Sequence, residues 1–183
     1  QHHDLAIAGA RVQAISRTSG TLRTVYQAPD TTESAPIVKV NGRIVIILQA
    51  EDPTSTRWTI SRVDLSTGDA ARVITRGVSI LNMLSTYEQH AALTHLTWCQ
   101  ADAAGTCPVS SVMSYNVAQD VPRLLATDDL ARSQANWSIV NIQQADATNN
   151  PAFTSYTPVP AGGHLRKVWM FEPNTAGSLK LVQ

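Results

Sequence analysis

One hairpin pattern recurs along this chain and limits its fold more than any other feature. In each copy, a short apolar strand leads into a polar turn, and a second strand follows within a few residues. The copies lie at 15–25, 63–73, 113–125 and 171–181. Gly68 follows Gly20 by 48 residues and precedes Gly177 by 109, about two steps of 54. The third copy lacks the glycine. A chain with this period is expected to consist of repeated antiparallel units.

The best-defined unit surrounds the second copy. Arg43 to Gln49 is an apolar run rich in Ile and Val, which predicts a strand buried on both faces. The dipeptide Asn41-Gly42 precedes it and predicts a type I′ turn, so residues 36–50 should form a hairpin. Strands over Arg57 to Leu65 and Ala71 to Thr75 complete four strands in up-and-down order.

Four strands in each period of about 40–55 residues are typical of propeller blades. We therefore predict an all-β fold of four-stranded antiparallel blades, forming a partial β-propeller in a single domain. The blades are expected at 1–28, which is incomplete, and at 35–77, 78–127 and 136–183. A β-sandwich or jelly roll of about 10–12 strands is the alternative, because 183 residues would make one complete domain of that kind.

Two segments of the predicted repeat are ambiguous. Apolar residues between 80 and 92 fall at helical spacing, so a helix competes with a strand predicted near Ser79–Leu84. The stretch from Leu124 to Ala135 fits either a short helix or a loop that joins two blades.

The sequence Val63-Asp64-Leu65-Ser66-Thr67-Gly68 resembles the blade-closing turn of β-propellers of the TolB and pyrroloquinoline-quinone-repeat kind. In those repeats an outer strand ends in Asp, a Thr-Gly turn follows, and the last strand begins soon after. The resemblance implies a ring of more blades than 183 residues can supply. The chain begins inside a blade, and exposed sheet edges are avoided in natural proteins. The remaining blades are therefore expected in the same precursor or in a second chain.

Two cysteines, Cys99 and Cys107, flank a polar loop between two predicted strands. Cysteines that face each other at the end of a hairpin can meet disulfide geometry, so we expect a bridge. Two separate buried thiols are the alternative, and the spacing matches no zinc motif. A disulfide would place the protein in an oxidising compartment, that is, in the periplasm, on the cell surface or outside the cell.

Three histidines are the candidate ligand-site residues. His90 and His95 flank or enter a predicted strand, and His164 follows Gly162-Gly163 in a predicted loop. Imidazole can bind a metal or transfer protons, although a spacing of five places His90 and His95 on opposite faces of a strand. Their clustering at one end of a sheet would favour an enzyme; surface or hydrogen-bonded histidines are the alternative.

Other motifs point to no catalytic centre. The acidic pairs Glu51-Asp52 and Asp128-Asp129 lie in predicted loops, where solvated carboxylates are common. No serine-nucleophile elbow and no glycine-rich phosphate loop is present. We therefore expect no catalytic residue, no cofactor and no metal. The four tryptophans, at 58, 98, 137 and 169, suit packing between sheets, with a sugar-binding platform as the alternative.

Composition limits the partners. Fourteen Lys and Arg residues balance fourteen Asp and Glu residues, which argues against nucleic acid because that partner requires a basic surface. The longest strongly apolar run, 44–48, is far too short for a transmembrane helix. The repeat, the expected disulfide and the lack of a catalytic constellation predict an extracytoplasmic binding or assembly module that contacts a protein or a glycan. There are two alternatives: the chain is part of a secreted propeller hydrolase or lyase, or it is a carbohydrate-binding sandwich.

Overall fold

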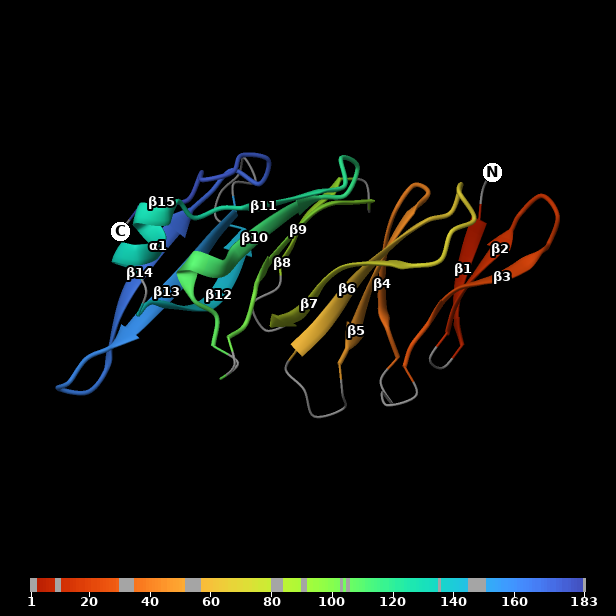
Figure 1. The fold of residues 1–183 in the computed structure, drawn as a ribbon. Helices are drawn as coiled ribbons and strands as arrows, with labels where there is room; N and C mark the ends of the chain where they lie inside the picture. The colour runs from red at the N-terminus through yellow and green to blue at the C-terminus, as the bar shows by residue number, and fades with distance from the viewer. Residues whose placement is uncertain are drawn as a thin grey trace. The chain divides into compact units, whose positions relative to one another are not determined.

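The computed structural model shows a chain built almost wholly from antiparallel strands (Figure 1), so the all-β prediction is confirmed. It describes residues 3–8, 11–29, 35–51, 57–79, 84–89, 92–102, 104, 106–134, 136–144 and 151–182. The chain divides into two compact units, Gln1–Val78 and Ser79–Gln183. Among the described residues, no helix is long and apolar enough to cross a membrane.

The first unit contains two sheets, and in each the strands lie side by side in chain order. The three-stranded sheet consists of β1 (His3–Ala8), β2 (Arg11–Ser16) and β3 (Leu22–Gln27). The four-stranded sheet consists of β4 (Ile37–Asn41), β5 (Ile44–Ala50), β6 (Arg57–Asp64) and β7 (Arg72–Ser79).

The second unit contains two four-stranded sheets of the same up-and-down order. One consists of β8 (Leu84–Gln89), β9 (Ala92–Cys99), β10 (Val112–Asn116) and β11 (Val121–Leu124). The other consists of β12 (Ser138–Gln144), β13 (Pro151–Pro158), β14 (His164–Met170) and β15 (Lys180–Leu181). A 3-10 turn, Val109–Ser111, precedes β10, and the six-residue helix α1 (Asp128–Ser133) lies between the sheets in sequence.

Four separate sheets do not match the sandwich alternative, which requires two sheets packed face to face.

The structure settles part of the segment between residues 80 and 92, for which a helix and a strand were both considered. Residues 84–89 form the strand β8 and not a helix, whereas residues 80–83 lie outside the described residues. The strand predicted near Ser79–Leu84 was misplaced, because β7 continues to Ser79. A hydrogen bond from the Gly77 N–H to Glu51 Oε1 (2.6 Å) ties this part of β7 to the end of β5.

The recurrent hairpin turns share one backbone geometry. Gly20, Gly68 and Gly177 all have positive φ, at 69°, 80° and 66°. In the third copy, Asp120 takes this position with φ 58°, and among the described non-glycine residues it alone has a positive φ. Asp tolerates the left-handed region better than most residues, which explains how the turn is kept without glycine.

Side chains of the strand ends support these turns. Asp64 accepts hydrogen bonds from the Ser66 N–H (3.0 Å) and the Ser66 hydroxyl (2.6 Å). The bond from the Ser66 hydroxyl is the main reason that the pKa of Asp64 lies below its ordinary value. Asn116 accepts in the same way from the Gln119 N–H (2.9 Å). The short polar residue before each of these two turns therefore satisfies backbone donors that the turn leaves open.

Asp120 combines this backbone role with a side-chain contact, because the Tyr115 hydroxyl, on a fully buried ring, donates to Asp120 Oδ1 (2.6 Å). Asp120→Gly keeps the turn but removes this acceptor, so we expect it to lower the free energy of unfolding by about 1 kcal/mol. Asp120→Ala loses the acceptor and also strains the backbone, which should cost about 1 kcal/mol more. Urea denaturation of both variants measures the difference; equal losses would contradict the backbone role.

The turn between β4 and β5 differs from its prediction. The strands pair Asn41 with Ile44, so the two loop residues are Gly42 and Arg43 and not Asn41-Gly42. Only Gly42 has positive φ (56°), which is the pattern of a type II′ turn. This register sets Val40 against Val45, whereas the predicted turn would have set Val40 against Arg43. Pairing of β-branched side chains across the strands therefore favours the observed turn.

Each unit has its own core. In the first, both sheets contribute to one buried cluster: Val12, Ala14, Val25, Val45, Ile47, Val63 and Leu65. Every residue of β5 is buried, as the apolar run predicted. In the second unit, the core joins the third and fourth sheets through Cys99, Cys107, Val109, Val112, Leu125, Ala126, Ile139, Trp169, Phe171 and Leu179.

Backbone hydrogen bonds also connect the two sheets of the second unit. The Ile139 N–H donates to the Cys107 carbonyl (2.7 Å), and the Val109 N–H donates to the Trp137 carbonyl (3.1 Å). Farther along the chain, the Leu179 N–H donates to the Leu125 carbonyl (3.1 Å). The loop that contains Cys107 is therefore part of the contact between these sheets.

Candidate functional site

His95, one of the three candidate histidines, lies within β9 in a polar cluster. Its Nε2 is 2.8 Å from Asn174 Oδ1, and its Nδ1 is 3.0 Å from the Thr94 hydroxyl. Asn116 Nδ2 donates to the same Asn174 oxygen (2.9 Å). The cluster joins β9 and β10 to the loop between β14 and β15.

The surrounding bonds assign the protons of this cluster. Asn116 Oδ1 accepts from the Gln119 N–H, so its Nδ2 must be a donor, and Asn174 Oδ1 must accept. His95 then donates from Nε2 to Asn174, and its Nδ1 accepts from the Thr94 hydroxyl. In this arrangement His95 Nε2 and Asn116 Nδ2, which are 3.1 Å apart, both donate to Asn174 Oδ1 and not to each other. Both ring nitrogens of His95 thus have hydrogen-bond partners, as expected for a histidine that holds two sheets together.

The histidines do not form one site. His164 begins β14, whereas Asn174, the partner of His95, follows the other end of that strand. A seven-residue strand is about 20 Å long, so the two groups are far apart. His164 packs its ring edge-on against Tyr156, with centroids 4.8 Å apart. His90 lies outside the described residues.

The acidic pairs are used locally. Glu51 binds the backbone of β7, and Asp52 lies outside the described residues. Asp128 and Asp129 occupy the first turn of α1, where carboxylates are favourable, and Asp129 pairs with Arg132. Within the described part of the chain, no group of three or more His, Cys, Asp or Glu residues could hold a metal ion.

The tryptophans divide into buried and half-buried positions. Trp98 and Trp169 are fully buried, which agrees with packing in the core. Trp137 is half-buried, and the ammonium of Lys167 lies 4.0 Å from the centre of its ring. One face of Trp137 is therefore covered by a cation, which makes it a poor platform for a sugar.

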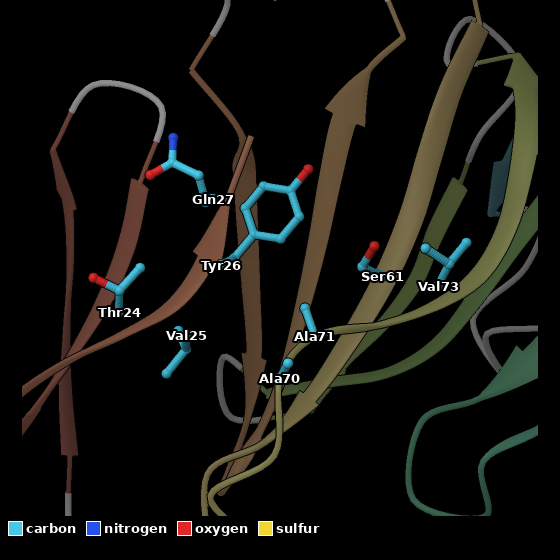
Figure 2. Close-up of a pocket in the computed structure, with 8 residues that line it drawn as sticks. All are labelled: Thr24, Val25, Tyr26, Gln27, Ser61, Ala70, Ala71 and Val73. Carbon is cyan, nitrogen blue, oxygen red and sulfur yellow. The ribbon is translucent and has the colours of Figure 1, made fainter. Parts of the chain in front are cut away.

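A cavity of about 350 Å³ lies between the two sheets of the first unit (Figure 2). Strand β3 supplies one wall, with Thr24, Val25, Tyr26 and Gln27. The other side is formed by Ser61 from β6, Val73 from β7, and Ala70 and Ala71 from the segment that leads into β7. A β-bulge shapes the first wall: Val12 pairs with Tyr26 and Gln13 pairs with Thr24, so Val25 is the extra residue.

Three residues with hydroxyl groups line this cavity, but Thr24 is exposed and its hydroxyl points away from Ser61 (Figure 2), so only the hydroxyls of Tyr26 and Ser61 lie beside the cavity. The side chains of Thr24, Tyr26 and Ser61 make no hydrogen bond with any described residue. Ser61 is only 2% exposed, but its Oγ is not among the fully buried side-chain atoms without a partner, so this small exposure includes the hydroxyl. Burial raises the pKa of the Tyr26 hydroxyl, and the positive charge of Arg76 partly opposes this effect. The cavity therefore offers neutral hydrogen-bonding groups and an aromatic ring.

The cavity was not predicted from the sequence. Its hydroxyl residues belong to strands of two different sheets, and Ser, Thr and Tyr are ordinary residues in strands. One signal was present: Ser61 falls on the same face of β6 as Val63, where an apolar residue would be expected in the core.

No protein-family model matches the chain, and no curated protein matches it in sequence. In structure, it is similar to an uncharacterized protein from Listeria monocytogenes, with a TM-score of 0.40 and 11% sequence identity. That alignment covers 98% of this chain and 49% of the other, so the chain spans about half the length of that protein. Assignment of the fold therefore depends on the chain's own strands and turns.

Proposed function

We propose that this chain is an extracytoplasmic assembly module of the β-propeller kind, whose sheets are completed by a protein strand from outside the described residues. The observation that carries the proposal is the position of the recurrent turn. It follows the third strand of each four-stranded sheet, namely β6, β10 and β14, but it follows β2 in the three-stranded sheet.

This comparison assigns each strand of the three-stranded sheet to a place in the repeat. By their distance from the turn, β3 corresponds to β7 and β1 corresponds to β5. The first position, which β4, β8 and β12 take in the other sheets, has no strand among the described residues. One edge of β1 is thus where an additional antiparallel strand would pair.

The burial of β1 supports this assignment. Its counterpart β5 is buried throughout, whereas Ile7 in β1 is 49% exposed and Leu5 is half-buried. An edge strand with exposed apolar side chains readily pairs with a strand from elsewhere. The Cys99–Cys107 pair, which lies at disulfide distance, supports an oxidising location for the assembly.

The test is the native mass of the non-reduced protein, compared with 19.8 kDa. We expect a particle of two or more chains, and slow hydrogen exchange at the backbone amides of β1. Ile7→Lys should shift the particle to a monomer, because natural edge strands use lysine to prevent pairing. Leu165→Lys is the matched control, since Leu165 is 56% exposed but lies in a different unit.

Three outcomes would overturn the proposal: a wild-type monomer of 19.8 kDa at all concentrations, an oligomer that Ile7→Lys leaves intact, or equal dissociation by both variants. A longer precursor that remains monomeric while its β1 amides are protected would support it. In that case the same polypeptide supplies the strand.

A further inference from the structure

We propose that the cavity between the two sheets of the first unit, lined by Thr24, Tyr26 and Ser61, binds a neutral sugar ring. Such binding does not depend on the assembly proposed above. It is supported by the unpartnered hydroxyls, by the charge of the cavity and by its size.

The hydroxyls indicate that the cavity takes a polar ligand. An apolar residue is the usual choice at a core-facing position of a strand. Yet Ser61 lies in the core-facing register of β6, and its hydroxyl has no partner in the described protein. Tyr26 presents its hydroxyl from the opposite wall, so a ligand between the walls could bond to both sides (Figure 2).

The charge of the lining favours a neutral ligand. None of the eight lining residues is ionised at neutral pH. The nearby Arg11 donates to Gln27 Oε1 (2.7 Å), and Arg76 has interactions of its own. A phosphate or nucleotide normally requires cationic side chains or a helix N-terminus, and the lining offers neither.

The mixture of apolar and polar groups suits a sugar better than a peptide strand. A sugar ring has apolar C–H faces and a rim of hydroxyls, which match the Tyr26 ring, the small apolar side chains of Val73 and Ala71, and the hydroxyls of Tyr26 and Ser61. A peptide bound as a strand would instead use backbone groups at a sheet edge. The volume of about 350 Å³ falls in the range of small-ligand sites.

The test is an NMR titration of the non-reduced chain with methyl glycosides of glucose, galactose and N-acetylglucosamine. We expect at least one of them to shift the backbone amide signals of Tyr26, Ser61 and Ala71 saturably, with a Kd on the order of 1 mM, typical of a small, weakly held ligand. Shifts that grow without saturation, or that occur equally in both units, would overturn the proposal.

Variants that remove single hydroxyls test the contacts. Tyr26→Phe and Ser61→Ala should each weaken binding about 5–10-fold, as expected for one lost hydrogen bond. Tyr156→Phe, in the other unit, removes the same group far from the cavity and should leave binding unchanged.

Thermal unfolding separates ligand binding from a structural role. Because the Ser61 hydroxyl has no partner among the described residues, Ser61→Ala should unfold at the same temperature as wild type or higher. A clear drop in unfolding temperature would instead show that the hydroxyl supports the fold, and would overturn the proposal. Saturable shifts produced by a neutral tripeptide but by no glycoside would show a peptide site and would also contradict it.

Discussion

Trp169→Ala is expected to lower the free energy of unfolding of the second unit by about 3–5 kcal/mol, the usual cost of removing a buried tryptophan. Trp169 is fully buried in the core that joins the third and fourth sheets. It lies on β14 between β13 and β15, where it pairs with Phe153 and Leu181. The deletion therefore leaves a cavity at the point where the two sheets meet.

Two further variants separate packing from hydrogen bonding. The indole Nε1 donates to the Ser155 hydroxyl (2.7 Å), and both groups are buried. Ser155→Ala leaves the N–H without its acceptor and should cost about 1–3 kcal/mol. Trp169→Phe loses both the N–H and part of the ring, and should fall between the other two variants.

Trp58→Ala is the control, because Trp58 is only half-buried and lies in the other unit. Denaturant unfolding followed by the fluorescence of the remaining tryptophans measures all four variants. A loss for Trp169→Ala no larger than that for Trp58→Ala would contradict the central role of Trp169 in the core.

Local chemistry explains which parts of the fold were predictable. A turn with positive φ favours glycine strongly, so Gly20, Gly68 and Gly177 marked three of the four hairpins by residue type alone. Asp120 was harder to find, because its backbone role is hidden in a residue that is common on protein surfaces. The start of β8 was misplaced for another reason: hydrophobic alternation does not fix where a short strand begins.

The sites were less predictable because they depend on residues distant in sequence. His95 was identified as a candidate, but its partner Asn174 is 79 residues away, and Asn116, which donates to the same Asn174 oxygen, is 58 residues from Asn174. The hydroxyls of Tyr26 and Ser61 lie beside one cavity only because two sheets pack together. The cysteines were the easier case, since Cys99 and Cys107 flank a single loop and lie at disulfide distance.

Reduction of the Cys99–Cys107 bond is expected to lower the free energy of unfolding of the second unit by about 2.5 kcal/mol. This figure follows from the chain entropy of a loop closed by cysteines eight residues apart. The structure gives a reason to expect the whole of this loss in the free energy of unfolding. Both cysteines are buried in the core, and the Cys107 carbonyl accepts the Ile139 N–H that links the third and fourth sheets.

A variant with Cys99→Ala and Cys107→Ala tests whether the bond itself is responsible. Its unfolding midpoint should match that of the reduced wild type and should not change when dithiothreitol is added. Unfolding of the first unit should be unaffected in both, because the two cysteines belong to Ser79–Gln183. If reduction left the wild-type midpoint unchanged, the bond would contribute nothing to stability.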